Sequence, residues 1–227
     1  MMAYWLFALL LAGLVFAYLW AERRQLNAIA YFCKPAATVT VIILLLYFVG
    51  VNGLFVQLVL AALILSLLGD IFLMLPSDRF IPGLASFFLA HIAYIAAFVT
   101  GLDTIAPDII WSLPIVYGVA LLWFVWPQLQ ALKIPVVLYA VVIMAMLLST
   151  IARYQAFPST SNLLLLLGAI IFVLSDSLIA LDKFQGQLFK KGMPRALTLI
   201  IVTYFVAQFL LVTGTIYQFS QLMPSNH

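Results

Sequence analysis

Two aspartates lie inside apolar segments of the chain, each long enough to cross a bilayer. Asp70 lies in the run 66–75, and Asp176 lies in the run 172–181, which has the same form. A carboxylate at membrane depth is costly unless it faces protein or water, so both are candidate functional residues. Two carboxyl groups that lie close together titrate as a pair, and a protonated group beside an ionised one can act as acid and base. The structural alternatives are hydrogen bonds across helices, or an ion pair between Asp176 and Lys34.

Four polar residues in other apolar segments form two pairs. His91 and Tyr94 are three residues apart, which places them on one face of a helix. Tyr204 and Gln208 are four residues apart and share a face for the same reason. All four are candidate site residues. The structural alternatives are a packed, hydrogen-bonded histidine in the first pair and interhelical hydrogen bonds from the second.

Lys34 begins a predicted span on the same side of the membrane as both aspartates. Its candidate roles are snorkelling to the lipid headgroups, binding a lipid phosphate and acting as counter-ion to an aspartate. A catalytic zinc site is poorly matched, because the chain has 2 histidines and a single cysteine, Cys33. A hard cation held by carboxylates remains compatible with the sequence, but we predict no metal site and no cofactor.

The composition predicts an integral membrane protein. Hydrophobic residues make up 67% of the chain and charged residues 7%, whereas soluble proteins average roughly 25% charged residues. A length of 227 residues allows about eight spans of about 20 residues with short loops. We therefore predict an all-α bundle of about eight transmembrane helices, with residues 1–227 as a single polytopic domain. The net charge of +3 is small and its carriers are scattered, so we expect no nucleic-acid partner.

Charged residues and prolines mark the predicted ends of the spans. Four prolines open even-numbered spans, where a missing N–H costs nothing, and these are Pro35, Pro82, Pro135 and Pro194. Pro114 predicts a kink in the fifth span. The predicted spans are about 3–20, 35–50, 54–75, 82–101, 107–127, 133–152, 162–181 and 194–219.

The basic residues predict the topology. Of the 10 lysines and arginines, Arg153 alone lies in an even-numbered loop. The positive-inside rule then places the odd-numbered loops in the cytoplasm and both the N-terminus and the C-terminus outside. The spans that carry Asp70 and Asp176 would run in the same direction, with each aspartate about five or six residues from the cytoplasmic end. The likeness of these two spans also suggests two parallel four-span repeats.

The polar residues, in this order and at this spacing, resemble the YhhN family of membrane lysoplasmalogenases. The resemblance extends from about residue 34 to residue 208. Each motif alone is weak, but their order, spacing and placement in the spans are specific together. The motifs are Lys34-Pro35, Ser66-Leu-Leu-Gly-Asp70, Gly83-Leu-Ala-Ser-Phe87, Ala90-His91-Ile-Ala-Tyr94, Phe172-Val-Leu-Ser-Asp176 and Tyr204-Phe-Val-Ala-Gln208.

The resemblance implies an ether hydrolase that cleaves the vinyl ether bond of lysoplasmenylcholine or lysoplasmenylethanolamine. The products would be a fatty aldehyde and glycerophosphocholine or glycerophosphoethanolamine. The reaction begins with protonation of the alkene carbon, which gives an oxocarbenium ion. A carboxyl pair can supply both the acid and the stabilising anion, as in glycosidases.

In this interpretation Asp70 and Asp176 share the acid and base roles. His91 and Tyr94 would orient water or polarise an oxygen, and Lys34 would bind the substrate phosphate. The complete set of substrate-binding or supporting residues that we expect is Lys34, His91, Tyr94, Tyr204 and Gln208.

Two other classes of function fit the same residues. A proton-coupled transporter of a small or lipid-like solute also places carboxylates and a histidine at membrane depth. A structural or lipid-binding membrane protein would bind lipid without turnover. For the enzyme we expect a lysophospholipid substrate and membrane lipids as partners, and the sequence leaves protein partners open. The compact chain suits a bacterial inner membrane, with multiple passes and periplasmic termini.

Overall fold

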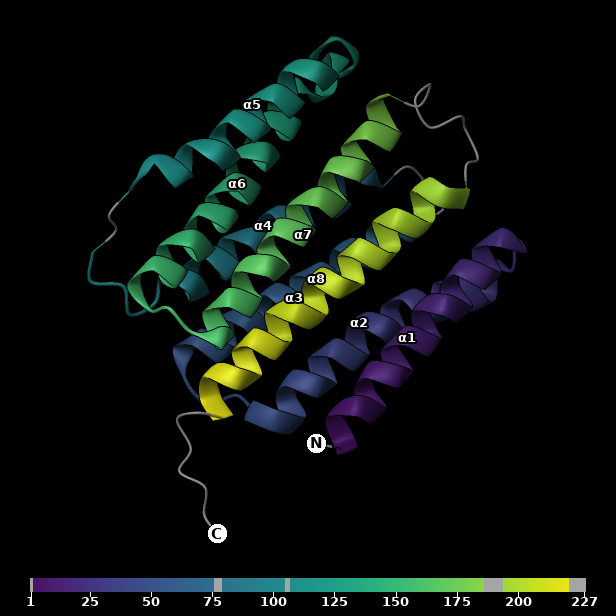
Figure 1. Ribbon diagram of the computed structural model, residues 1–227. Coiled ribbons are helices and arrows are strands. Elements are labelled where there is room, and N and C mark those ends of the chain that lie inside the picture. The colour runs from purple at the N-terminus through teal and green to yellow at the C-terminus, as the bar shows by residue number, and fades with distance from the viewer. Residues whose placement is uncertain (1, 76–78, 105–106, 186–193, 221–227) are drawn as a thin grey trace.

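The computed structural model describes residues 2–75, 79–104, 107–185 and 194–220, and the side chains of these residues except at 194, 195 and 220. Within these residues, eight helical segments are long and apolar enough to cross a membrane, which confirms the predicted fold class. The helices lie alongside one another in one bundle (Figure 1). Their bounds are α1 Met2–Arg23, α2 Asn27–Val49, α3 Leu54–Met74, α4 Phe80–Val99, α5 Ser112–Val125, α6 Lys133–Ala156, α7 Thr160–Phe184 and α8 Pro194–Ser220.

The first connection is shorter than predicted. Helix α2 begins at Asn27, so Pro35 lies inside the helix and the prediction that it opens the span is wrong. The chain reverses within residues 24–26, where Gln25 has a φ of 56° and the backbone N–H of Leu26 donates to the carbonyl of Ala21 at 2.9 Å. Residues 27–33 are mostly apolar and continue the helix. As a result Lys34 lies within the bundle.

The other prolines lie at helix starts. Pro82 and Pro135 fall in the first turns of α4 and α6, and Pro194 is the first residue of α8, as predicted. Pro114 also falls in the first turn of its helix, because α5 begins at Ser112 after a short 3-10 turn. The predicted kink at Pro114 is therefore wrong. Lys190 and Lys191, which contributed to the topology prediction, lie outside the described residues.

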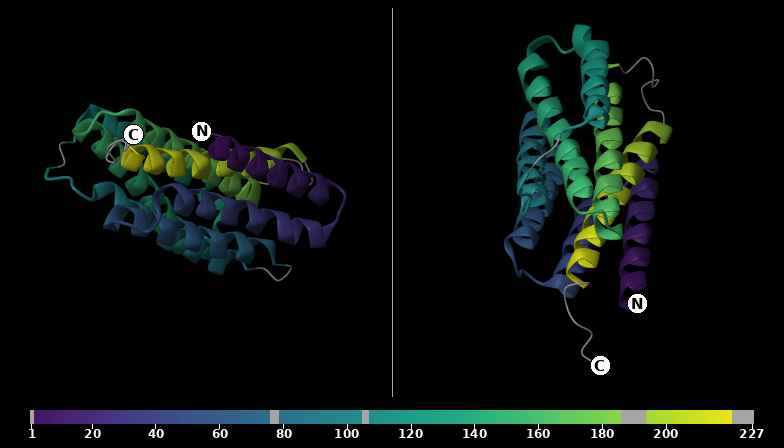
Figure 2. Two further views of the ribbon diagram at one scale, coloured as in Figure 1. Left: turned by 90° about the horizontal axis from the view of Figure 1, so that it is seen from below. Right: turned by 60° about the vertical axis from the view of Figure 1, so that its left-hand side comes forward.

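Six helices form a closed ring. Around it, α2 packs on α3, α3 on α4, α4 on α6, α6 on α7, α7 on α8, and α8 on α2. Helix α1 lies outside the ring against α2 and α8, while α5 lies outside it against α6 and α7 (Figures 1 and 2). The start of α1 and the end of α8 lie at the same end of the bundle (Figure 1).

The two halves of the chain use the same packing scheme. Helices α1–α4 and α5–α8 each place their first helix outside the ring and pack their third helix on their fourth. The fourth helix of each half then packs on the second helix of the other half, which closes the ring. This arrangement agrees with the predicted parallel repeat and gives α3 and α7 equivalent places.

Glycines allow the third and fourth helices of each half to approach closely. A Cβ atom on Gly69 of α3 would lie 2.6 Å from the ring of Phe87 on α4. A Cβ atom on Gly168 of α7 would lie 2.9 Å from the side chain of Leu211 on α8. Small residues at such crossings favour helix association in membranes, where apolar burial alone does not drive it.

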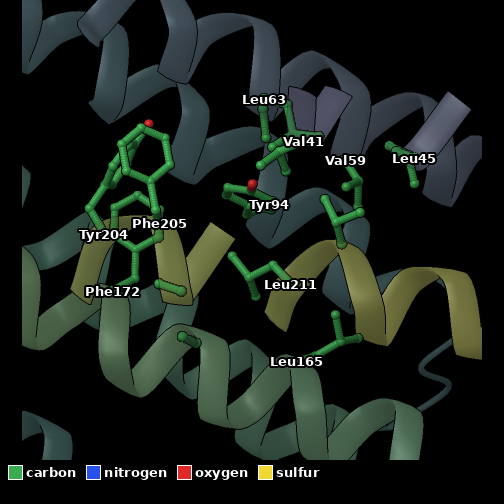
Figure 3. Packing of buried hydrophobic residues seen from close by; sticks show 14 of the residues in the cluster. Val41, Leu45, Val59, Leu63, Tyr94, Leu165, Phe172, Tyr204, Phe205 and Leu211 are labelled. Atoms are coloured by element: carbon green, nitrogen blue, oxygen red, sulfur yellow. The ribbon is translucent and has the colours of Figure 1, made fainter. Parts of the chain in front are cut away.

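Large side chains fill the interior of the ring. Phe172 of α7 packs beneath Tyr204 and Phe205 of α8, and Tyr94 of α4 lies near Leu211 (Figure 3). The ring centroids of Phe172 and Tyr204 are 5.7 Å apart in an edge-to-face arrangement. Because these rings are packed tightly, they fix the positions of the polar side chains around them.

Candidate active site

Both aspartates lie toward the same end of the bundle, near the C-termini of α3 and α7. Asp70 is four residues before the end of α3, and Asp176 is eight residues before the end of α7. At a rise of 1.5 Å per residue these positions are about 6 Å and about 12 Å from the helix ends. The prediction that each aspartate lies five or six residues from the helix end is therefore wrong, because α3 ends sooner after its aspartate and α7 continues further.

Asp70 is surrounded by donors. Its carboxylate Oδ1 lies 3.1 Å from Nζ of Lys34. Its Oδ2 accepts hydrogen bonds from the hydroxyls of Thr38 and Tyr204, both at 2.7 Å. Asp70 is 1% exposed. Three donors on one buried carboxyl group, one of them an ammonium, are the pattern of an ionised carboxylate.

The role of Lys34 in the structure is that of counter-ion to Asp70. The side chain is 7% exposed, so it does not reach the surface as a snorkelling lysine would. The proposed structural pair between Lys34 and Asp176 is wrong, because the ammonium lies on the other aspartate. A buried ammonium or carboxylate without its partner would have a high free energy, and the ion pair between Lys34 and Asp70 avoids this.

Tyr94 and Gln208 extend the Asp70 cluster across the ring. The hydroxyl of Tyr94 donates to Oε1 of Gln208 at 2.7 Å, and Nε2 of Gln208 donates to the hydroxyl oxygen of Tyr204 at 3.3 Å. Tyr204 donates in turn to Asp70. The bonds connect α4, α8 and α3, which is the interhelical hydrogen bonding expected as the structural alternative.

Asp176 has different surroundings. The hydroxyl of Tyr139 on α6 donates a hydrogen bond to Oδ2 of Asp176. Asp176 also lines an apolar pocket of about 60 Å³ whose other walls include Leu73, Phe87 and Ile179. A carboxyl group with one polar partner and apolar walls is much less costly as a neutral acid than as an anion.

Sequence reasoning missed Tyr139. The signal that could have found it is the repeat, because α6 occupies the place in the second half that α2 occupies in the first. Thr38 follows Pro35 by three residues and donates to Asp70, and Tyr139 follows Pro135 by four residues and donates to Asp176.

His91 belongs to the Asp176 side, apart from Tyr94. Its Nδ1 lies 2.6 Å from the carbonyl oxygen of Phe87, which can only accept, so Nδ1 carries the hydrogen. The other ring nitrogen, Nε2, is buried without a hydrogen-bond partner among the described residues. The imidazole packs edge-to-face on Tyr139, with centroids 5.4 Å apart, and on Phe172, at 5.0 Å.

Aromatic rings lie between the two carboxyl groups. Phe87 packs against Tyr204 of the Asp70 cluster, with ring centroids 5.9 Å apart, and also lines the Asp176 pocket. The site therefore consists of two neighbouring parts that meet at Phe87, an ionic cluster and an apolar pocket. In the described part of the chain, no three histidine, cysteine or carboxylate side chains gather as metal ligands.

Comparison with known proteins identifies the family of this architecture. The model of the YhhN family matches residues 29–215. "Lysoplasmalogenase TMEM86B" of Homo sapiens is 29% identical over 212 residues, covering 93% of this chain and 86% of the relative. "Lysoplasmalogenase" of Mycobacterium bovis is 32% identical, covering 54% of this chain and 48% of the relative. No solved structure matches the chain significantly. "Uncharacterized membrane protein YhhN" of Escherichia coli O157:H7 is 26% identical over 158 residues, covering 68% of this chain and 72% of the relative. This likeness and the eight apolar helices among the described residues make the chain a multi-pass integral membrane protein.

Proposed function

Because this chain belongs to the YhhN family, we propose that it is a lysoplasmalogenase, an ether hydrolase that acts on lysoplasmenylcholine and lysoplasmenylethanolamine. Two relatives, one of them aligned over most of the chain, carry the name lysoplasmalogenase. The observation that carries the chemistry is Asp176, a carboxyl group that lines an apolar pocket and has a single hydroxyl partner among the described residues. These two lines of support are independent of each other.

Asp176 is the proposed acid. Its Oδ2 accepts from Tyr139, so Oδ1 is the oxygen that carries the acidic proton. Transfer of this proton to the alkene carbon breaks the double bond and leaves an oxocarbenium ion beside the new Asp176 carboxylate. The same carboxylate then accepts a proton from the attacking water, as the acid–base residue of a retaining glycosidase does. The hemiacetal that results collapses to the aldehyde and the glycerol hydroxyl, so the acid is regenerated.

His91 is the proposed acceptor for the water. Its Nε2 has a lone pair, no partner among the described residues and a position against the ring of Tyr139. A water that donates one hydrogen to this nitrogen would have an oriented lone pair for the oxocarbenium carbon. The proposed role of His91 is therefore the one predicted from the sequence, which is to orient water. Tyr94 instead donates to Gln208 and supports the Asp70 cluster.

Asp70 is the proposed positioning anion. The ion pair with Lys34 and the bond from Tyr204 tie together α2, α3 and α8 at the level of the site. Its oxygens are occupied by these donors and by Thr38, so it is poorly placed to exchange protons with water. Asp70 and Asp176 would therefore act in different ways, in contrast to an equal sharing of roles.

The substrate headgroup is proposed to lie at the outer end of the Asp176 pocket. Phe80 and Phe184 line that pocket, and the ammonium of Lys183 lies 4.5 Å from the centre of the Phe80 ring. A phosphate contact from Lys34 has less support, because its ammonium is buried against Asp70. Lys183 is the better candidate to attract the phosphate.

The membrane orientation is proposed from charge. Arg23, Lys133 and Lys183 lie at helix ends on the side of the bundle that holds the site. The positive-inside rule assigns this side to the cytoplasm, with both termini periplasmic if the membrane is a bacterial inner membrane. The vinyl ether of a lysolipid in the cytoplasmic leaflet would then lie close to the depth of the aspartates.

The test is aldehyde release by the purified protein in detergent. Lysoplasmenylcholine and lysoplasmenylethanolamine are the substrates, and an ester lysolipid with the same chain is the control. We expect aldehyde from the vinyl ethers and no fatty acid from the ester. Folded protein that turns over none of these lipids would overturn the proposal. The alternative of a proton-coupled transporter is not favoured by the relatives' names, and turnover without a membrane gradient would exclude it as the sole function.

A further inference from the structure

A second hollow adjoins the pocket of Asp176 from the outside of the bundle. It is a groove of about 240 Å³ between α4 and α6, which we call the α4–α6 groove, and it is lined by Ile81, Leu84, Phe88, Ile134, Leu138 and Tyr139. Leu84 and Tyr139 also line the pocket of Asp176. The two hollows therefore share a wall, and the hydroxyl on that wall is the one bonded to Asp176.

We propose that the α4–α6 groove binds the single hydrocarbon chain of the lysolipid substrate and delivers its vinyl ether past Tyr139 to Asp176. The proposal rests on the proposed function, because it names where the substrate of that reaction lies. In this proposal α4 and α6 form a binding subsite for the hydrocarbon chain. The side chains of Leu84 and Tyr139 lie where this subsite meets the pocket of Asp176.

The surface of the groove suits a lipid chain in the bilayer. Ile134 is 74% exposed and Leu138 54%, so its outer rim faces the hydrocarbon phase. The groove lining is almost wholly apolar, and Tyr139 provides a hydroxyl at the inner side. The hydrocarbon chain of a lipid could thus move from the bilayer into the groove without removing water from a charged group.

The size of the inner pocket limits what can reach the acid. A site needs about 10–15 Å³ of accessible volume for one water, so the roughly 60 Å³ pocket holds only a few water-sized groups. A slender alkenyl segment fits this description better than two chains side by side. The wide groove and narrow pocket together favour a one-chain lipid as occupant.

A second groove provides a matched comparison. The α1–α8 groove is larger, at about 420 Å³, and is lined by apolar residues that include Ala12, Phe16 and Phe209. None of its lining residues lines the pocket of Asp176. Both grooves face lipid, but the α4–α6 groove alone of these two continues toward a carboxyl group. Ala85 and Ala12 are exposed alanines, and each lines one of the two grooves.

The experiment is photocrosslinking in detergent with a lysophosphatidylcholine that carries a diazirine in its single acyl chain. We expect labelled peptides from residues 81–88 and 134–139, and we expect excess unlabelled lysophosphatidylcholine to suppress the labelling. The variant Ala85→Trp should reduce this labelling and aldehyde release by about tenfold, because the indole fills the groove. The variant Ala12→Trp should leave both within about twofold, since surface changes away from a site have small effects.

The outcomes separate the two proposals. Labelling of α4 and α6 without aldehyde release would support the groove as a lipid-chain site and overturn the reaction. Aldehyde release with labelling confined to the α1–α8 groove would overturn the α4–α6 subsite and keep the reaction. Unchanged labelling and activity in folded Ala85→Trp protein, checked by its melting temperature, would also overturn the subsite.

Discussion

Asp70 and Asp176 lie on helices that occupy equivalent places in the two halves of the molecule, but their surroundings differ. Asp70 on α3 forms an ion pair with Lys34, accepts hydrogen bonds from Thr38 and Tyr204, and is buried. Asp176 on α7 accepts a hydrogen bond from Tyr139 and lines a pocket. A repeated scaffold thus holds the same side chain in two environments, one that stabilises a charge and one that favours a neutral acid.

The difference teaches how one bundle can hold one carboxyl group in an ion pair and leave another lining a pocket. Removing one partner from a buried ion pair leaves an uncompensated charge and is strongly destabilising, so such pairs hold helices in one arrangement. A carboxyl group with one hydroxyl partner contributes less to stability and stays available to a substrate. We therefore expect stability and activity to depend on different aspartates. Three predictions test that division, and a fourth tests the headgroup end of the Asp176 pocket.

The largest effect should come from Asp176→Asn. The amide keeps the shape of the side chain but cannot donate the proton, and general acid catalysis contributes about 10²–10⁴-fold to rates. We expect aldehyde release to fall by about 10³-fold while the melting temperature in detergent changes little. A large fall in melting temperature would show that Asp176 stabilises the fold, and would contradict the proposed difference between Asp176 and Asp70.

The next effect should come from Asp70→Asn. This change leaves the ammonium of Lys34 buried without its carboxylate, and breaking such a pair costs about 3–5 kcal/mol. Equilibrium unfolding in mixed detergent should show a loss near the lower end of this range. The double variant Lys34→Met with Asp70→Asn should recover part of it, because both charges are then absent. Additive losses in the double variant would show that the ion pair is not the source.

The two tyrosines sharpen the comparison because Tyr→Phe removes the hydroxyl and keeps the ring. Tyr139→Phe removes the bond to Asp176 and should lower the turnover number by about tenfold, with a small change in stability. Tyr204→Phe removes a bond to Asp70 and should lower the unfolding free energy by about 0.6 kcal/mol, typical of such bonds in membrane bundles. Equal effects of both changes on turnover would argue that the two parts act as one unit.

The smallest effect should come from Lys183→Gln. If this ammonium attracts the substrate phosphate at the outer end of the pocket, the KM should rise by about threefold at low salt and less at high salt. Lys133→Gln is the control, because Lys133 lies over Trp126, with its Nζ 4.9 Å from the ring centre. A similar rise in KM for both variants would indicate a general surface charge effect.

The sequence predicted much of the fold because membrane insertion depends on local composition. Eight apolar segments each satisfy their own backbone hydrogen bonds, so their number follows from length and hydropathy. Pro82, Pro135 and Pro194 marked helix starts because a proline lacks only a hydrogen that the first turn does not use. The same reasoning gave a wrong helix start at Pro35, because neighbouring helices allow a proline inside a membrane helix.

The sequence by itself determined the span number and the two aspartates at membrane depth, since both follow from residue type along a short stretch. Tertiary structure decided which partner each aspartate receives. Asp70 is 134 positions from Tyr204, and Asp176 is 37 positions from Tyr139. These bonds depend on how the helices rotate and close the ring, and packing across the whole bundle sets that rotation. The same chemical group therefore forms an ion pair on α3 and lines an apolar pocket on α7.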